Sequence, residues 1–299
     1  GENGRATAYV NNAGPLGGSS LDPYATIQEG VNGALSGGTV LVASGTYVED
    51  VNINKPLTLT GAGAATTTIS GVIGGSDGAT VRIAASNVTI SGFTLTREGN
   101  NLADWNNGGL NFAGIAIQGA FVGAVIHDNI ITGNRTGIDI NNSSGHTIRN
   151  NVITNNRTGM LFRNQTDNLN VVENSITDNW TVGVLFLDAS GGSNSPLQQS
   201  LGSAFSNNDI SGNWYGQIVD RQTGGSLPAP GANLKSFRGN WLGNTSPVIS
   251  NANSAEPGYA ALIPVVFGGT STPPGGQPDV AGEASANLQI YPLLTSGTD

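Results

Sequence analysis

Seven polar or charged side chains fall where they could act on one substrate. In a strand, successive side chains point to opposite faces, so residues two apart share a face. Applied to short repeated segments of this chain, that rule places on one face Gln118, Asp139, Asn141, Arg163 and Asp220, with Asp188 and Arg221 at the corner where this face ends. Carboxylate, amide and guanidinium groups in one row suit acid–base chemistry on a polysaccharide, with Asp139, Arg163, Asp188 and Asp220 as the catalytic candidates.

The three carboxylates allow more than one chemistry. Neighbouring strands lie about 5 Å apart, so Asp188 and Asp220, one repeat apart, have roughly the separation that a retaining glycosidase needs. Asp139 and Asp188, two repeats apart, are nearer the separation of an inverting pair. Alternatively, the three aspartates Asp139, Asp188 and Asp220 could bind calcium. Arg163 would then serve as the base of a polysaccharide lyase. A solvated row of charges without catalytic function is the remaining alternative.

Two tryptophans offer a further contact for sugars. Trp180 and Trp214 occupy the same column of the repeats as Arg135 and Arg157. An exposed tryptophan ring stacks well on the apolar face of a sugar, so the pair could bind substrate beside the polar row. The alternative is that each ring covers a corner of the fold.

These positions follow from an internal repeat. Four segments carry one pattern and a fifth begins it: VIHDNIITGNRTGIDINN (125–142), TIRNNVITNNRTGMLFRN (147–164), VVENSITDNWTVGVLFLD (171–188), AFSNNDISGNWYGQIVDR (204–221) and SFRGNWLGN (236–244). The leading asparagines are spaced by 22, 23, 34 and 32 residues: Asn129, Asn151, Asn174, Asn208 and Asn240. A unit of 22 or 23 residues with occasional insertions predicts a solenoid.

Each repeat predicts three short strands and leaves no room for a helix. Apolar residues alternate with polar ones in three runs, around Ile126, around Ile131 and around Ile138. Strands of successive repeats must then stack in parallel, about 4.8 Å apart. The repeated asparagine falls at the bend between the first and second strands, where its amide can bond its own turn and the next asparagine. A glycine near the start of each third strand predicts a turn with positive φ, at Gly137, Gly159, Gly183 and Gly216.

Composition excludes several classes of protein. The 299 residues carry a net charge of -9 and only two lysines, Lys55 and Lys235, so the basic stripe of a nucleic-acid binder is missing. Cysteine is absent, which rules out disulfides and thiolate chemistry. No apolar run approaches the length of about 20 residues that spans a bilayer, so we expect no membrane insertion. The 35 asparagines and many glycines suit a secreted or cell-surface protein of bacterial type.

The repeats resemble the right-handed parallel β-helix proteins of the pectate-lyase-like superfamily. The asparagine column, Asn129 to Asn240, is similar to that family's asparagine ladder, and the segment around Ile27, Val31 and Leu35 resembles its N-terminal capping helix. The resemblance implies an all-β fold: a single-stranded right-handed parallel β-helix of three parallel sheets with a short N-terminal capping helix. We expect one domain, with a cap over 1–37, coils over 38–244 and a closing segment over 245–299.

In that family the third-strand sheet forms the substrate groove. The loops at 97–113, 189–203 and 222–235 fall at the two corners that flank this sheet. The outward pairs then include Leu161 with Arg163, Leu185 with Leu187, and Ile218 with Asp220. The family's catalytic motifs are missing, however: there is no Gly-His-Gly, Trp-x-Asp-His or Gln-Asp-Thr-Leu run.

The sequence therefore predicts a secreted β-helix that engages polysaccharide or a cell-surface glycan along its third-strand face. A polysaccharide lyase or glycosidase is one hypothesis, and a non-catalytic structural, matrix or adhesin module is the other. Because both ends look capped, we expect a monomer. Calcium is the one cofactor that the acidic residues suggest.

Overall fold

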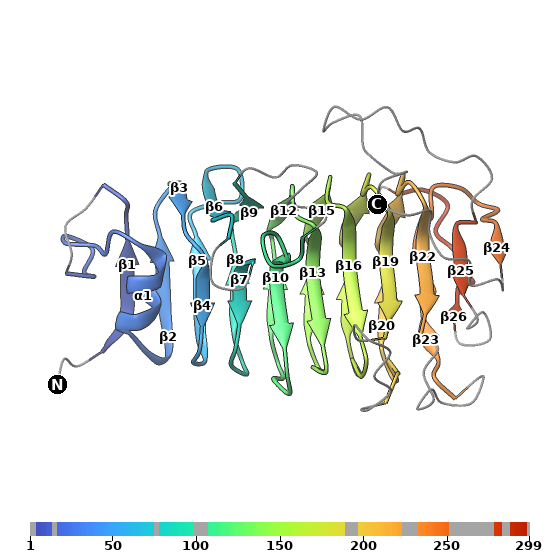
Figure 1. Ribbon diagram of the computed structural model, residues 1–299, viewed down its shortest axis with the longest axis horizontal. Helices are drawn as coiled ribbons and strands as arrows, with labels where there is room; N and C mark the ends of the chain where they lie inside the picture. The colour runs from blue at the N-terminus through green and yellow to red at the C-terminus, as the bar shows by residue number, and fades with distance from the viewer. Residues whose placement is uncertain are drawn as a thin grey trace.

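The computed structural model describes residues 4–13, 17–74, 78–98, 107–188, 197–222, 232–250, 278–282 and 288–297. In these residues the chain winds repeatedly through three sheets, and every strand pairs in parallel with the equivalent strand of the next coil. Figure 1 shows the coils stacked along the long axis, from the N-terminal coils to β24 near the C-terminal end. The predicted parallel β-helix is confirmed.

Each sheet collects one strand of every coil. Sheet A contains, in spatial order, β1 (Arg5–Val10), β2 (Ala34–Val42), β5 (Leu57–Gly61), β8 (Thr89–Ser91), β11 (Val125–His127), β14 (Thr147–Arg149), β17 (Asn170–Val172), β20 (Ala204–Ser206), β23 (Lys235–Ser236) and β26 (Leu288–Gln289). Sheet B contains β21 (Asp209–Ser211), β18 (Ser175–Thr177), β15 (Val152–Thr154), β12 (Ile130–Thr132), β9 (Thr94–Arg97), β6 (Thr67–Gly71) and β3 (Gly45–Val48). Sheet C contains β24 (Ile249–Ser250), β25 (Val280–Gly282), β22 (Gly216–Arg221), β19 (Val182–Leu187), β16 (Thr158–Arg163), β13 (Thr136–Asn141), β10 (Ala113–Gln118), β7 (Ala79–Ile83) and β4 (Val51–Ile53).

A short helix, α1 (Ile27–Gly33), packs at the N-terminal end of the coil (Figure 1). Thr26 and Glu29 form a capping box that satisfies backbone groups at its start. Ile27 and Val31 are buried in the core, as predicted for a capping helix. The predicted third member of that face, Leu35, lies instead in β2 and is exposed, because the helix ends at Gly33 and the chain becomes extended at Ala34.

The core consists of side-chain columns that run along the coil axis. In sheet C, Ile138, Met160, Val184 and Ile218 follow one another in register, and all four are buried. Toward the C-terminal coils the inward positions become aromatic, with Phe162 and Phe186 in sheet C facing Phe205 in sheet A and Phe237, which directly follows β23. The rings of Phe205 and Phe237 stack with centroids 4.2 Å apart. These columns exclude water from the interior and supply the main hydrophobic stabilisation.

The leading asparagines are hydrogen-bonded to one another in the bend between sheets A and B. Asn174 Oδ1 accepts from the backbone N–H of Asn151 and from its Nδ2, both at 3.0 Å. Asn208 Oδ1 does the same for Asn174, at 2.9 and 3.0 Å. The Nδ2 groups also donate to backbone carbonyls, so each amide satisfies buried backbone groups in two coils.

A second column of asparagines occupies the bend between sheets B and C. Asn134, Asn156, Asn179 and Asn213 are joined by the same pattern of bonds, and Gln217 Oε1 accepts from Asn213 at the end of the column. Asn134, Asn156 and Asn179 each begin an Asn-x-Thr or Asn-x-Ser sequence. Because these side chains are buried and engaged, the matches reflect the fold and do not mark glycosylation sites.

The repeated glycines serve a different purpose from the predicted one. None of the four has positive φ: Gly137, Gly159 and Gly183 are each the second residue of a sheet C strand, and Gly216 is the first residue of β22. A Cβ at Gly159 would instead lie 2.5 Å from the carbonyl oxygen of Gly183 and 3.0 Å from Asn179 Nδ2. Glycine is therefore required because successive coils approach too closely for a side chain.

Candidate functional site

The outer face of sheet C, whose strands β7 to β22 lie side by side in Figure 1, carries two neighbouring columns of side chains. The first column contains Gln118, Asn141, Arg163, Leu187 and Arg221. The second contains Arg82, Ala116, Asp139, Leu161, Leu185 and Val219. We call Gln118, Asp139, Asn141 and Arg163 the polar cluster.

Asp139 is the centre of the polar cluster. Its Oδ1 accepts from Arg163 Nη2 and from Gln118 Nε2, each at 2.9 Å, and from Arg163 Nε at 3.2 Å. The Arg163 guanidinium lies 5.2 Å from the centre of the Phe112 ring, which packs over the small side chains of β7 and β10. Three successive strands thus place an amide, a carboxylate and a guanidinium in contact, as the period of two predicts.

Burial controls the chemistry of this carboxyl group. Asp139 is fully buried, and burial raises its pKa, against the lowering effect of the charge and hydrogen bonds of Arg163, the Gln118 bond and the charge of Arg135. Its second oxygen, Oδ2, has no hydrogen-bond partner. A carboxyl group in this state can retain a proton at a pH where an exposed aspartate would be ionised.

Asn141 joins the polar cluster to the next corner. Its Oδ1 accepts from Asn164 Nδ2 at 2.8 Å, and the buried Gln198 donates to Asn164 Oδ1. The amide is therefore held in place at the rim of the cluster.

The expected outward position of Asp220 and Ile218 is wrong. Ile218 pairs in register with Val184, and Asp220 pairs with Phe186, so both side chains point into the coil. The corners before β19 and β22 are one residue longer than those before β13 and β16, so Gly216 takes the place of Val182. A slip of one residue reverses the face of every side chain in a strand.

Inside the coil, Asp220 has a charged partner. Lys235 Nζ lies 2.6 Å from Asp220 Oδ2, and both side chains are buried. The same ammonium lies 4.5 Å from the centre of the Phe186 ring. Asp220 is thus not available to a substrate on the sheet C face.

The structure does not bring the three aspartates together. Asp139 is held on the outer face by Arg163, Asp220 faces the interior, and Asp188 follows the end of β19 half-buried. In the described ranges, no group of three or more His, Cys, Asp or Glu side chains could hold a metal ion. Arg221, expected at the corner, is the last residue of β22 and takes the outward position that was expected of Asp220, with its guanidinium 5.8 Å from the centre of the Tyr215 ring.

The two tryptophans pack against each other. Trp180 and Trp214 meet edge to face with ring centroids 5.6 Å apart, and Trp180 Nε1 donates to Asn155 Oδ1 at 3.3 Å. Trp214 is only 9% exposed, so its faces are largely unavailable for stacking on a sugar. This arrangement favours a role in covering the corner.

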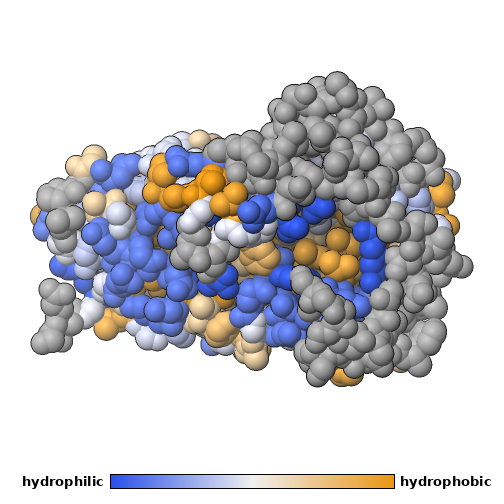
Figure 2. Space-filling model, viewed as in Figure 1, coloured by the Kyte–Doolittle hydropathy of each residue, from blue (hydrophilic) through white to orange (hydrophobic). Residues whose placement is uncertain are grey.

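Beyond the polar cluster the face becomes apolar. Leu161, Leu185 and Val219 are buried, and they form a cluster with Val182, Tyr215 and Ala281. Figure 2 shows hydrophilic residues over the middle coils and an apolar area beside them, toward the C-terminal coils. The parts of the expected groove walls at 99–106, 189–196 and 223–231 lie outside the described residues.

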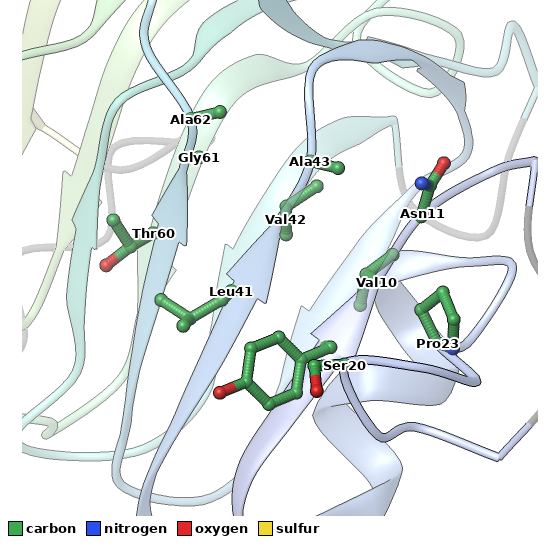
Figure 3. Close-up of a pocket in the computed structure, with 11 residues that line it drawn as sticks. Val10, Asn11, Ser20, Pro23, Leu41, Val42, Ala43, Thr60, Gly61 and Ala62 are labelled. Atoms are coloured by element: carbon green, nitrogen blue, oxygen red, sulfur yellow. The ribbon is translucent and has the colours of Figure 1, made fainter.

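A hollow of about 300 Å³ lies elsewhere, on sheet A near the N-terminal end. Figure 3 shows Leu41 and Thr60 on adjacent strands, with Ser20 and Pro23 on the neighbouring loop. Its lining contains no charged residue and none of the residues that the sequence singled out.

Comparison with known proteins agrees with the fold. The architecture defines a parallel β-helix protein with one polar, arginine-containing face. The chain belongs to the NosD family, whose model, described as "Periplasmic copper-binding protein (NosD)", matches residues 31–214. No curated protein matches the chain.

Two solved structures are similar in part. Pectin methylesterase PemA from Erwinia chrysanthemi has 14% identity and a TM-score of 0.45, over 68% of this chain and 78% of that one. The ORF18 protein of Geobacillus virus E2 has 15% identity and a TM-score of 0.38, over 72% of this chain and 38% of that one.

Sequence reasoning missed Phe112 and Lys235. Phe112 lies in a loop before β10, where no repeat defines its position. Lys235 had a signal, because it is one of only two lysines and precedes the fifth repeat. Its inward direction depends on β23, which is only two residues long.

Proposed function

We propose that the polar cluster and the arginines beside it bind an acidic polysaccharide outside the cytoplasm. The proposal rests on one observation, which is the contrast between the charge of this face and that of the whole chain. The chain has a net charge of -9. On the described strands of sheet C, however, the outward positions carry Arg82, Arg163 and Arg221 against a single acidic residue, Asp139. The burial that raises the pKa of Asp139 also weakens its contribution of negative charge.

Guanidinium groups on a flat sheet suit carboxylate ligands. Their planar donors match a carboxylate in two parallel hydrogen bonds, and they keep their charge at any physiological pH. Parallel strands repeat the same surface about every 4.8 Å. Such a surface can contact successive sugar units of an extended chain. The family's description as periplasmic supports a location where extracytoplasmic polysaccharide is present.

A catalytic role for Asp139 is the second candidate. Its Oδ2 is buried without a partner, and its pKa is raised, so the group can hold a proton; donation to a substrate requires that substrate binding expose this fully buried oxygen. This state favours an acid catalyst, as in a polysaccharide lyase or glycoside hydrolase. Asp188 is the second carboxylate of the proposal, since Asp220 faces the interior. Calcium remains a proposal in which the polysaccharide supplies part of the ligand set.

Affinity electrophoresis tests the binding proposal. We expect polygalacturonate and alginate, with and without calcium, to retard the protein, and dextran to leave it unaffected. Arg163→Gln should weaken the binding about tenfold. Arg149→Gln is the matched control, because Arg149 points outward from sheet A. Equal weakening by the two variants, or no retardation by any acidic polysaccharide, would refute the proposal.

Product analysis separates the enzyme from the binding module. New reducing ends or unsaturated products, abolished in Asp139→Asn while binding persists, would establish catalysis. Binding without products would assign the non-catalytic function. Light scattering of the same samples tests the expected monomer.

A further inference from the structure

The NosD family is described as copper-binding, so we ask which side chains of this chain could ligate a copper ion. Copper in proteins is held by thiolate, thioether and imidazole groups, whereas sites made only of oxygen suit magnesium, calcium or manganese. The whole chain contains no cysteine, one methionine and two histidines. These are Met160, His127 and His146, and all three lie in the described residues.

Met160 has no access to a metal ion. It is fully buried on the inner face of β16, where its register partners are Ile138 and Val184. Its thioether is therefore surrounded by aliphatic side chains. Because it is the one sulfur atom of the chain, no second soft ligand can join it.

His146 has both ring nitrogens engaged. Its Nδ1 accepts from the backbone N–H of Ala124 at 3.1 Å, and its Nε2 lies 2.7 Å from Ser143 Oγ. Ser143 Oγ donates to the carbonyl of Phe121, so the proton between the ring and the hydroxyl belongs to Nε2. The lone pair that a metal would need is thus already used in a buried hydrogen bond.

His127 is partly accessible but isolated from other donors. It points outward from sheet A, with Nδ1 2.5 Å from Asp128 Oδ2. Its register partners are Ser91 on β8 and Arg149 on β14, and the positive charge of Arg149 opposes a cation. His146 lies three residues before Arg149, roughly 10 Å along the strand. One imidazole and one exposed carboxylate remain, which is too few for a specific copper site.

We infer that this member of the NosD family holds no copper on its own chain. Its family membership reflects the repeated coil, most of which the match over residues 31–214 covers, and the three soft donors in that coil do not form an accessible set of copper ligands. This inference is independent of the polysaccharide proposal, because it concerns sheet A and the core instead of the polar cluster.

Equilibrium dialysis tests the inference. Metal-free protein is dialysed against Cu(II), or against Cu(I) under a reductant, with a competing chelator, and retained copper is measured by mass spectrometry. We expect far less than one equivalent per chain. Arg149→His is the positive control, since it places a second imidazole across from His127 on the adjacent strand and should raise Cu(II) retention at least tenfold.

Either outcome decides the matter. Low retention in the wild-type protein, alongside clear retention in Arg149→His, supports the inference. One equivalent in the wild-type protein, lost in His127→Ala or in His146→Asn, would overturn it and identify the ligand. Polysaccharide binding by these variants should be unchanged, so failure of one proposal does not affect the other.

Discussion

Lys235 Nζ donates to Asp220 Oδ2 over 2.6 Å inside the hydrophobic coil, where neither side chain reaches solvent. Gln222 completes the contact, since its backbone N–H donates to Asp220 Oδ1 at 3.1 Å. Removing one partner of a buried ion pair strongly destabilises a protein, whereas replacing both partners with apolar residues has a small effect. The difference arises because a single partner left behind is a buried charge without compensation.

We predict that Lys235→Met lowers the free energy of unfolding by about 3–5 kcal/mol, because it leaves the Asp220 carboxylate buried without its charged partner. The double variant Lys235→Met with Asp220→Leu should recover most of that loss. Urea unfolding of the three proteins measures the difference. A loss in the double variant as large as that of Lys235→Met alone would contradict this account of the pair.

The asparagine column in the bend between sheets A and B gives a second prediction. Asn174→Ala removes the acceptor of two N–H groups of Asn151 and the donor to two carbonyls. Each orphaned buried group costs about 1–3 kcal/mol, so the variant should unfold at clearly lower denaturant concentration. Asn170→Ala is the control, because Asn170 is exposed on β17 and its partner in the next coil is already Ala204. Similar losses in both variants would count against the column as a stabilising element.

Acid should destabilise the fold through His146. Burial lowers the pKa of His146 to about 4, below its ordinary value of about 6.5, so the folded state disfavours the protonated ring. The contribution of the neutral His146 ring to the free energy of unfolding is fully present above pH of about 6.5. It is lost as the pH falls toward about 4, and the total loss is about 3 kcal/mol. Asp139 and Glu49, whose pKa values are raised by burial, act in the opposite direction.

The pH effect is measured by unfolding the wild-type protein and His146→Asn in urea at pH 7 and pH 4.5. The loss between the two pH values should be smaller in the variant by about 2 kcal/mol. An equal loss in the two proteins would show that another group is responsible.

The close approach of successive coils predicts a strict requirement for glycine. Gly159→Ala should destabilise the protein by about 1–3 kcal/mol, because the new methyl group would meet the backbone of β19. Gly108→Ala is the comparison, since the nearest atoms to its Cβ would be 3.9 Å away. Thermal unfolding should place the two variants well apart, and coincident curves would disprove the steric explanation.

The fold was predictable because asparagines and inward apolar residues recur at equivalent positions of successive repeats. The spacing from Asn129 to Asn151 and Asn174 defines a coil, and inward residues such as Ile126 and Ile131 define the strand faces. The polar cluster followed from the same period. The inward direction of Asp220 could not be predicted in this way. Asn179 and Asn213 are each followed by one residue more, before the sheet C strand, than the asparagines of the two preceding coils, and aligning Gly216 with the earlier glycines conceals this additional residue.

The role of the glycines and the histidines depends on distances between coils that no single repeat contains. Gly137 has the sequence context of a turn, and its true constraint is the carbonyl of Gly159 in the next coil. His146 directly precedes a strand in the sequence, and only the fold shows that its ring is buried and hydrogen-bonded to Ala124 and Ser143.

The hydrogen bonds between Asn174 and Asn208, at 2.9 and 3.0 Å, nearly equal those between Asn151 and Asn174, both at 3.0 Å, although the chain between the first pair is longer by eleven residues, 34 against 23. The register between successive coils therefore does not depend on the length of the chain that connects them. A foreign peptide grafted between Asp188 and Leu197 would leave the backbone register on both sides intact. The protein is in this sense a natural display scaffold, in which new surface sequences can be exchanged without redesigning the core.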